Sequence, residues 1–281
     1  MRRRLGSGLL SLPGLAWLAL FFLIPLVIVL IVSLGDHDRY GHILLNAPNL
    51  DNYAAALDPM FLPTVWNSLR YAAATTVLCL IIGFPVAYWI SRYGGRHKTI
   101  LLVLVMLPFW TSYLIRTYAW ITILGDAGVV NSMLQAVGLI DEPIVLLNTD
   151  LAVVLGMTYG FLPFAILPLF VSIDRLDDAL VAAARDLYAS GRSAFFHVTL
   201  PLTMPGIVAA SILTFIPAIG DFVTPDLLGG AETTTIAKII QIQFLGARDW
   251  PAGAAMGFLL MAATIIASLA VIRSLRREVL G

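Results

Sequence analysis

The sequence predicts an all-helical integral membrane protein with about six transmembrane helices and both termini in the cytoplasm. Of its 281 residues, 59% are hydrophobic and only 12% are charged, whereas an ordinary soluble domain has about 25% charged residues. Six apolar runs are each long enough to cross a bilayer, which takes about 20 residues of helix. Basic residues collect in alternate segments between these runs. Helices are expected rather than strands because hydrocarbon offers exposed backbone groups no partner, and because barrel strands are shorter and alternate.

The six apolar runs follow one another along a single membrane domain that we take to cover residues 1–281. Their core strings are LPGLAWLALFFLIPLVIVLIVSL, ATTVLCLIIGFPVAYWI, TILLVLVMLPFWTSYLIRTYAWITIL, AVVLGMTYGFLPFAILPLF, MPGIVAASILTFIPAIGDF and AAMGFLLMAATIIASLAVI. The predicted helices therefore cover about 12–34, 66–91, 99–124, 150–172, 204–222 and 252–272.

The first run follows Arg2, Arg3 and Arg4, as the apolar core of a secretory signal would. That core is usually 7–15 residues long and ends at a small-residue cleavage site. Because this run is longer and has no clean cleavage site, we expect it to remain as an uncleaved first helix.

The basic residues predict the orientation of the helices, because cytoplasmic segments carry an excess of lysine and arginine. The larger group consists of Arg2, Arg3, Arg4, Arg92, Arg96, Lys98, Arg175, Arg185, Arg192, Arg273, Arg276 and Arg277. The opposite segments contain Arg39, Lys238 and Arg248. This alternation through six spans places both termini in the cytoplasm.

The segments on the other side of the membrane are acidic. They contain Asp36, Asp38, Asp51, Asp58, Asp126, Asp141, Glu142, Asp150, Asp221, Asp226, Glu232 and Asp249. Most of these fit ordinary solvated loop residues, but together they make a negative mouth that raises the local concentration of cations.

Several classes of protein are excluded by what the sequence lacks. The net charge is zero, which argues against a nucleic-acid binder. Cys79 is the single cysteine and the four histidines are scattered, so neither a disulfide framework nor a metal site is expected. No phosphate loop and no nucleophile elbow occurs. We therefore expect a non-catalytic chain that binds no cofactor or metal of its own.

The predicted cytoplasmic segment of about 174–203, between the fourth and fifth helices, is the most informative part of the chain. Apolar residues recur there at helical spacing, which predicts a helix over about 176–189. They are Leu176, Leu180, Ala183, Ala184 and Leu187. Ser190 and Gly191 end this helix, and the string FFHVTL leads on to Pro201. The consecutive alanines make a narrow face, and the mixed acidic and basic polar face favours docking into a partner's groove over lying on lipid.

This segment resembles the cytoplasmic loop of bacterial ABC importer permeases, whose pattern is E-A-A-x3-G-x9-I-x-L-P. The corresponding residues are Ala182, Ala183, Ala184, Tyr188, Val198, Leu200 and Pro201. Ala182 replaces the glutamate and Tyr188 replaces the glycine, which predicts that the helix continues through Tyr188. The resemblance implies that this loop couples the membrane part to an ATPase subunit. The residues assigned to that role are Ala182, Ala183, Ala184, Arg185, Asp186, Leu187, Tyr188, Ser190, Leu200 and Pro201.

Longer strings extend the resemblance over nearly the whole chain and narrow it to the first of the two permease subunits of spermidine/putrescine importers. They are PFWTSYLIRTYAW, FLPFAILPLF, AARDLYAS, LPLTMPGIVA, FVTPDLLGG and IQFLGARDWPAGAA. The resemblance implies a type I permease fold in the bacterial inner membrane, forming half of a pathway for a small cationic solute such as a polyamine. It also implies a paralogous second permease, two ATPase subunits that bind ATP and Mg, and an extracytoplasmic solute-binding protein.

A polyamine needs anions and aromatic walls along its pathway, since rings hold alkylammonium groups by cation–π contact. The candidates for such a pathway are Trp110, Tyr113, Tyr159, Asp221 and Asp226. Asp221, which follows Pro217 and Gly220, fits equally well as an ordinary cap. Arg70 and Arg116 either snorkel to the interface or contact the acidic outer loops or the binding protein. A permease for another small solute and a stand-alone channel or ion-driven carrier remain as alternatives.

Overall fold

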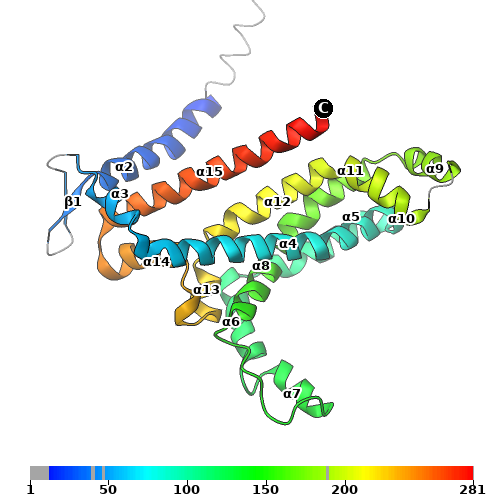
Figure 1. Cartoon of the computed structure of the whole chain (residues 1–281), viewed down its shortest axis with the longest axis horizontal. Coiled ribbons are helices and arrows are strands. Elements are labelled where there is room, and N and C mark those ends of the chain that lie inside the picture. The colour runs from blue at the N-terminus through cyan, green and yellow to red at the C-terminus, as the bar shows by residue number, and fades with distance from the viewer. Residues whose placement is uncertain (1–12, 39–41, 46–47, 188–189, 281) are drawn as a thin grey trace, which may run out of the picture. The chain divides into compact units, whose positions relative to one another are not determined.

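The structure, a computed structural model, describes residues 13–38, 42–45, 48–187 and 190–280. Arg2, Arg3, Arg4, Arg39 and Tyr188, to which the sequence assigns roles, lie outside these residues. The described chain is mainly helical (Figure 1) and divides into two compact units, one of Met1–Phe61 with Ile239–Ile265 and the other of Leu62–Lys238 with Ile266–Gly281.

The first unit contains short helical segments from the early part of the chain, a short hairpin and parts of two later helices. Its elements are η1 (Ala19–Leu23), α2 (Ile24–Ser33), β1 (Asp36–His37), β2 (Ile43–Leu44), α3 (Asp51–Ala56), η2 (Pro59–Phe61), the end of α14 (Ile236–Gln241), η7 (Ile242–Ala247) and the first part of α15 (Trp250–Leu280). The strands are antiparallel, with Asp36 opposite Leu44. Asn52 fastens α3 to the turn after α2, because its Nδ2 donates to the Ser33 carbonyl at 3.2 Å and to the Gly35 carbonyl at 2.8 Å.

The second unit is built around three long helices, α4 (Leu62–Tyr93), α8 (Asp150–Asp174) and α12 (Met204–Ile219), which pack side by side (Figure 1). Its remaining elements are η3 (Gly95–His97), α5 (Lys98–Met106), η4 (Leu107–Trp110), α6 (Tyr113–Leu124), α7 (Val129–Ala136), α9 (Asp178–Asp186), α10 (Gly191–Ala194), η5 (Phe195–Thr199), α11 (Leu200–Leu202), α13 (Val223–Leu228) and η6 (Ala231–Thr233).

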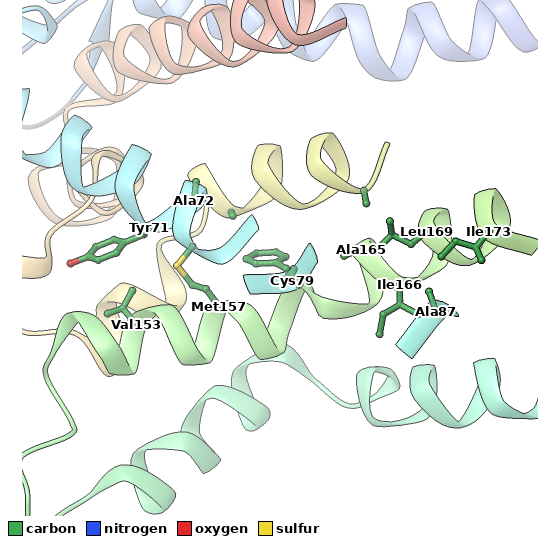
Figure 2. Packing of buried hydrophobic residues seen from close by; sticks show 13 residues of the cluster. Tyr71, Ala72, Cys79, Ala87, Val153, Met157, Ala165, Ile166, Leu169 and Ile173 are labelled. Carbon is green, nitrogen blue, oxygen red and sulfur yellow. The ribbon is translucent and has the colours of Figure 1, made fainter. Parts of the chain in front are cut away.

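Small residues let these three helices approach closely, as expected where lipid removes most of the hydrophobic drive between helices. Ala72, Ala87, Ala165 and Ala210 are fully buried. A Cβ added at Gly206 would lie 2.3 Å from the Ser172 Cβ. Figure 2 shows the larger side chains of the same core, with Tyr71, Val153 and Met157 at one end and Ile166, Leu169 and Ile173 at the other.

The expected helical membrane fold is confirmed, with four to six candidate spans and the short β1–β2 hairpin as the one sheet among the described residues. In the described residues, Pro13–Ser33, Pro59–Tyr93, Asp150–Asp174 and Trp250–Leu269 are long and apolar enough to cross a membrane. Two bent pairs bring the number to as many as six: Gly95–Trp110 with Tyr113–Ala136, and Gly191–Leu202 with Met204–Ile219. The cytoplasmic position of both termini stays a prediction.

The third predicted helix, 99–124, is broken rather than continuous. Its two halves bend by 83°, and Thr111 between them is extended, with φ −75° and ψ 158°. Pro108 contributes to the break because proline has no N–H to continue the helical ladder. Arg116 Nη1 reaches back across the break to the Pro108 and Thr111 carbonyls, at 3.4 and 3.3 Å.

Candidate functional site

The predicted coupling loop forms a short exposed helix, α9, at the far end of the second unit from α7 (Figure 1). Asp177 caps its start, because Oδ1 accepts from the Ala179 N–H at 2.9 Å. Ala182 and Ala183 are exposed and Ala184 is half-buried, while Leu180 and Leu187 are 49% and 82% exposed. The alanine face and its flanking leucines are therefore available to another protein.

The α9 helix is shorter than the predicted 176–189 and ends at Asp186, with Leu187 as its C-cap. Ser190 begins the next helix, where its Oγ accepts from the Ser193 N–H at 3.2 Å. Arg185 and Asp186 are exposed in the last turn of α9. The predicted role of Tyr188 lies outside the described residues.

The second half of the loop packs on α4. The Phe195 ring lies 5.7 Å from the Phe84 ring and 6.5 Å from the Tyr88 ring, both edge-on. Leu200 is half-buried and Pro201 is exposed at the start of α11. This half of the loop is anchored by rings, whereas α9 extends from it.

Two basic residues, one at the end of α4 and one at the start of α5, hold the segment that joins α8 to α9. Arg92 donates to the Asp178 carboxylate and, through Nη2, to the Leu176 carbonyl at 3.3 Å. Lys98 Nζ lies 2.6 Å from Asp174 Oδ1, which also accepts from Ser91 Oγ at 3.1 Å. From the sequence, Arg92 and Lys98 contributed only to the predicted orientation of the helices. Their place opposite a run of aspartates was the signal that could have predicted these pairs.

A second candidate site is a hollow of about 490 Å³ between η4, α6, α8 and α12. Its walls include Met106, Phe109, Trp110, Tyr113, Arg116, Gly160, Phe161, Pro163, Phe164, Leu167, Pro217 and Asp221. The structure thus brings together Trp110, Tyr113 and Asp221 from the predicted pathway group. Trp110 is 75% exposed.

Asp221 is both a wall of this hollow and a cap of α13. Its Oδ1 accepts from the Val223 and Thr224 N–H groups at 2.9 and 3.3 Å. Its Oδ2 accepts from Tyr113 Oη at 2.7 Å and from Thr224 Oγ1 at 2.6 Å. The side chain is buried, so four donors stabilise one carboxylate that has little contact with solvent.

The guanidinium of Arg116 lies over three aromatic rings beside the hollow. The distances from Cζ to the ring centroids are 5.0 Å for Phe109, 5.4 Å for Tyr113 and 5.9 Å for Tyr159. Tyr159 also contacts Phe109 at 5.3 Å between centroids. We call Phe109, Tyr113 and Tyr159 the aromatic cage. Sequence reasoning found two of its rings but missed Phe109 as a cage residue and Arg116 as its occupant.

The remaining candidates lie elsewhere. Asp226 forms an ion pair with Lys238 at 2.9 Å and is not among the walls of the hollow. Arg70 pairs with Asp150 at 2.9 Å, and Tyr71 donates to the same carboxylate. Of the two roles expected for Arg70, the structure shows a contact with an acidic residue, which is the first residue of α8.

Residues 4–279 match the family described as "Binding-protein-dependent transport system inner membrane component". The spermidine/putrescine transport system permease protein PotB of Haemophilus influenzae is 43% identical over 241 residues, which cover 86% of this chain and 84% of that protein. PotB of Escherichia coli is 40% identical over 239 residues, covering 85% and 86%.

The fold resembles that of solved importers. One chain of a bacterial ABC transporter that imports the acidic polysaccharide alginate superposes with a TM-score of 0.77 at 18% identity, covering 98% of this chain and 96% of that one. A chain of the alginate transporter in complex with a pentasaccharide-bound periplasmic protein gives 0.76 at 19% identity, covering 99% and 96%. At these identities the likeness shows the fold alone.

Proposed function

The chain belongs to the family of binding-protein-dependent transport system inner membrane components, and we propose that it forms half of the pathway of an ATP-binding-cassette importer for a polyamine. It is a multi-pass permease subunit of the bacterial inner membrane, and ATP hydrolysis belongs to a separate subunit. One observation supports the assignment of a polyamine as the substrate: the chain is 40–43% identical to spermidine/putrescine permeases over most of both chains.

The hollow supports a cationic substrate on chemical grounds. Its walls hold the buried Asp221 carboxylate and exposed rings, and both attract ammonium groups. Neither wall resembles a site for an anion, because the one guanidinium there already lies on the rings. A linear polyamine carries its charges on separated amines. One ammonium group could therefore contact the rings while the others lie further along the pathway.

We further propose that α9 docks into an ATPase subunit, as the exposed alanine face and Leu187 favour. The Arg92–Asp178 pair then ties α9 to α4, and the Lys98–Asp174 pair ties the end of α8, just before α9, to α5. Movement of the ATPase would therefore reach both helices through charged contacts. A paralogous permease would supply the other half of the pathway, two ATPase subunits would bind ATP and Mg, and a binding protein would deliver the solute.

Reconstitution in proteoliposomes tests this function. The chain is purified with its paralogue and ATPase and supplied with its binding protein, and radiolabelled spermidine and putrescine are used as substrates. We expect uptake that requires ATP, the ATPase and the binding protein. Uptake without the ATPase would favour a channel or ion-driven carrier. Transport of another solute but of neither polyamine would overturn the proposed polyamine specificity.

A further inference from the structure

The aromatic cage already holds a cation that belongs to the chain. Arg116 lies within 6 Å of three ring centroids, which is the range at which a guanidinium or ammonium is attracted to a ring. The rings come from different parts of the fold, because Phe109 lies in η4, Tyr113 in α6 and Tyr159 in α8. A cage assembled from three elements is a built site rather than an accident of one helix face.

Arg116 is bound there only by neutral groups. Among the described residues no carboxylate forms an ion pair with it, in contrast to Arg70 and Arg92. Its hydrogen bonds to the Pro108 and Thr111 carbonyls, at 3.4 and 3.3 Å, are long. The contacts that hold Arg116 are therefore ones that a substrate ammonium could replace with little change in energy.

The charge of the hollow depends on where Arg116 lies. With its guanidinium on Tyr113, the positive charge stands on one side of that ring while the Tyr113 hydroxyl donates to Asp221. The walls are then close to neutral. If Arg116 left the cage, the rings would be free and the Asp221 charge would be uncompensated, so the hollow would attract cations.

We propose that Arg116 is a tethered cation that occupies an amine subsite and competes with one ammonium group of the substrate. This inference rests on the proposed polyamine function and adds a specificity device to it. Arg116 excludes small inorganic cations, which cannot replace its contacts with the rings, and it yields to an alkylammonium group that makes the same contacts. Phe109, Tyr113 and Tyr159 then bind the substrate amine.

A purely structural role for Arg116 makes a different prediction. If the guanidinium only capped the carbonyls at the break between η4 and α6, its removal would weaken the hollow and every ligand in it. Competition instead predicts tighter binding once the guanidinium is gone. The sign of the change separates the two roles.

The test measures binding of radiolabelled spermidine to the assembled transporter by equilibrium dialysis, without the binding protein. Since a cation–π contact contributes about 0.5–2 kcal/mol, R116Q should bind spermidine roughly 2- to 30-fold tighter than the wild type. R116K retains a cation at the rings, although lysine stacks on them less well than arginine, and it should gain clearly less than R116Q. The double variant F109L/R116Q should lose most of the gain. The proposal is overturned if R116Q binds no tighter, or if R116K gains as much as R116Q.

A second variant changes the charge after assembly, in case R116Q does not assemble. Within this chain a thiol reagent reaches R116C selectively, because Cys79 is its single native cysteine and is fully buried. The same reagents applied to the wild-type complex control for cysteines of the partner subunits. A thiol reagent that adds a neutral methylthio group should leave spermidine binding tight, and one that adds an aminoethylthio group should weaken it. Equal binding after both reagents contradicts competition. If the wild-type complex imports no polyamine in proteoliposomes, the proposed function fails instead, whatever these variants show.

Discussion

Basic side chains have different partners in two regions of the molecule. Near the start of α9 they pair with carboxylates, whereas beside the hollow Arg116 lies on the aromatic cage. Arg92 forms an ion pair with Asp178 in α9, whose side chain is 81% exposed, and Lys98 forms one with Asp174 at the end of α8. In the hollow, Arg116 meets rings and backbone carbonyls. Exposed ion pairs break and form again at a cost of about 0–1 kcal/mol, which suits a joint that moves. A cation held on aromatic rings gives way only to another cation that makes the same contacts, and such selectivity is useful in a substrate pathway.

This comparison teaches that the partner of a charge, more than its position along a helix, separates the two roles. Both regions follow a helix end or break and both contain arginine. Only the ion pairs near α9 could transmit a movement of the ATPase to the membrane helices. Only the contacts of Arg116 with the rings could be replaced by contacts with a cationic substrate. The predictions below disturb one region at a time, from the largest effect to the smallest.

The largest effect is expected where α9 meets its proposed partner. A183E places a carboxylate on the exposed alanine face without disturbing the chain's own packing. Burying an unpaired charge in an interface costs more than about 1.4 kcal/mol, so ATP-driven spermidine uptake should fall at least about tenfold. Co-purification of the ATPase should fall with it. The matched control is A231E, the same change at an exposed alanine in η6; an equal loss there would show that α9 has no special role.

In the hollow, Y113F removes the hydroxyl that donates to Asp221. Removing one hydrogen bond from a buried carboxylate costs about 1.5 kcal/mol, and the Tm of the purified complex should fall by about 3 °C. Y118F changes an exposed tyrosine and serves as the control. A Tm unchanged in Y113F but lowered in Y118F would contradict the described contact.

At the contact between α4 and α9, R92Q breaks the ion pair with Asp178 and leaves the alanine face of α9 intact. We expect the ATPase to remain bound and uptake to fall roughly threefold, because the pair is partly exposed. More ATP should be hydrolysed for each spermidine imported. R96Q, which changes an exposed arginine near the same helix end, should leave that ratio unchanged. If R92Q lowered ATPase binding and uptake together, Arg92 would help the ATPase bind rather than transmit its movement to α4.

The smallest effect is expected at Arg70 and Asp150, whose side chains are 43% and 52% exposed. R70Q should change the free energy of unfolding by less than about 1 kcal/mol. The difference from the wild type should shrink as salt rises from 50 to about 500 mM, because salt screens exposed pairs. Chemical denaturation of the purified complex at both salt concentrations measures this. A difference that does not change with salt would mean that packing of the arginine stem, rather than the ion pair, stabilises this end.

Hydropathy was enough to predict the fold class, because the apolar runs are long and lipid leaves the helix as the simplest solution. The start of α9 could also be predicted, since Asp177 caps a run of apolar residues at helical spacing. The break after Trp110 could not, because proline is common in membrane helices that do continue.

The contacts of the two sites depend on pairings that a single sequence does not contain. Phe109, Tyr113 and Arg116 follow helical spacing, which hinted at a shared face, but Tyr159 joins them only because α8 packs there. Asp226 was grouped with Asp221 by its chemistry and nearness in sequence, yet it lies against Lys238. Arg92 and Asp178 lie far apart in sequence, and only the fold brings them together.

The central claim is that α9 is the part of this permease that an ATPase subunit moves. A photo-crosslinking amino acid at Leu187, which is 82% exposed, tests it most directly in the intact complex during spermidine uptake. We predict that the crosslinked product contains the ATPase and that its yield changes between ATP-bound and ATP-free conditions. Uptake at the wild-type rate with no ATPase captured under either condition would contradict the claim.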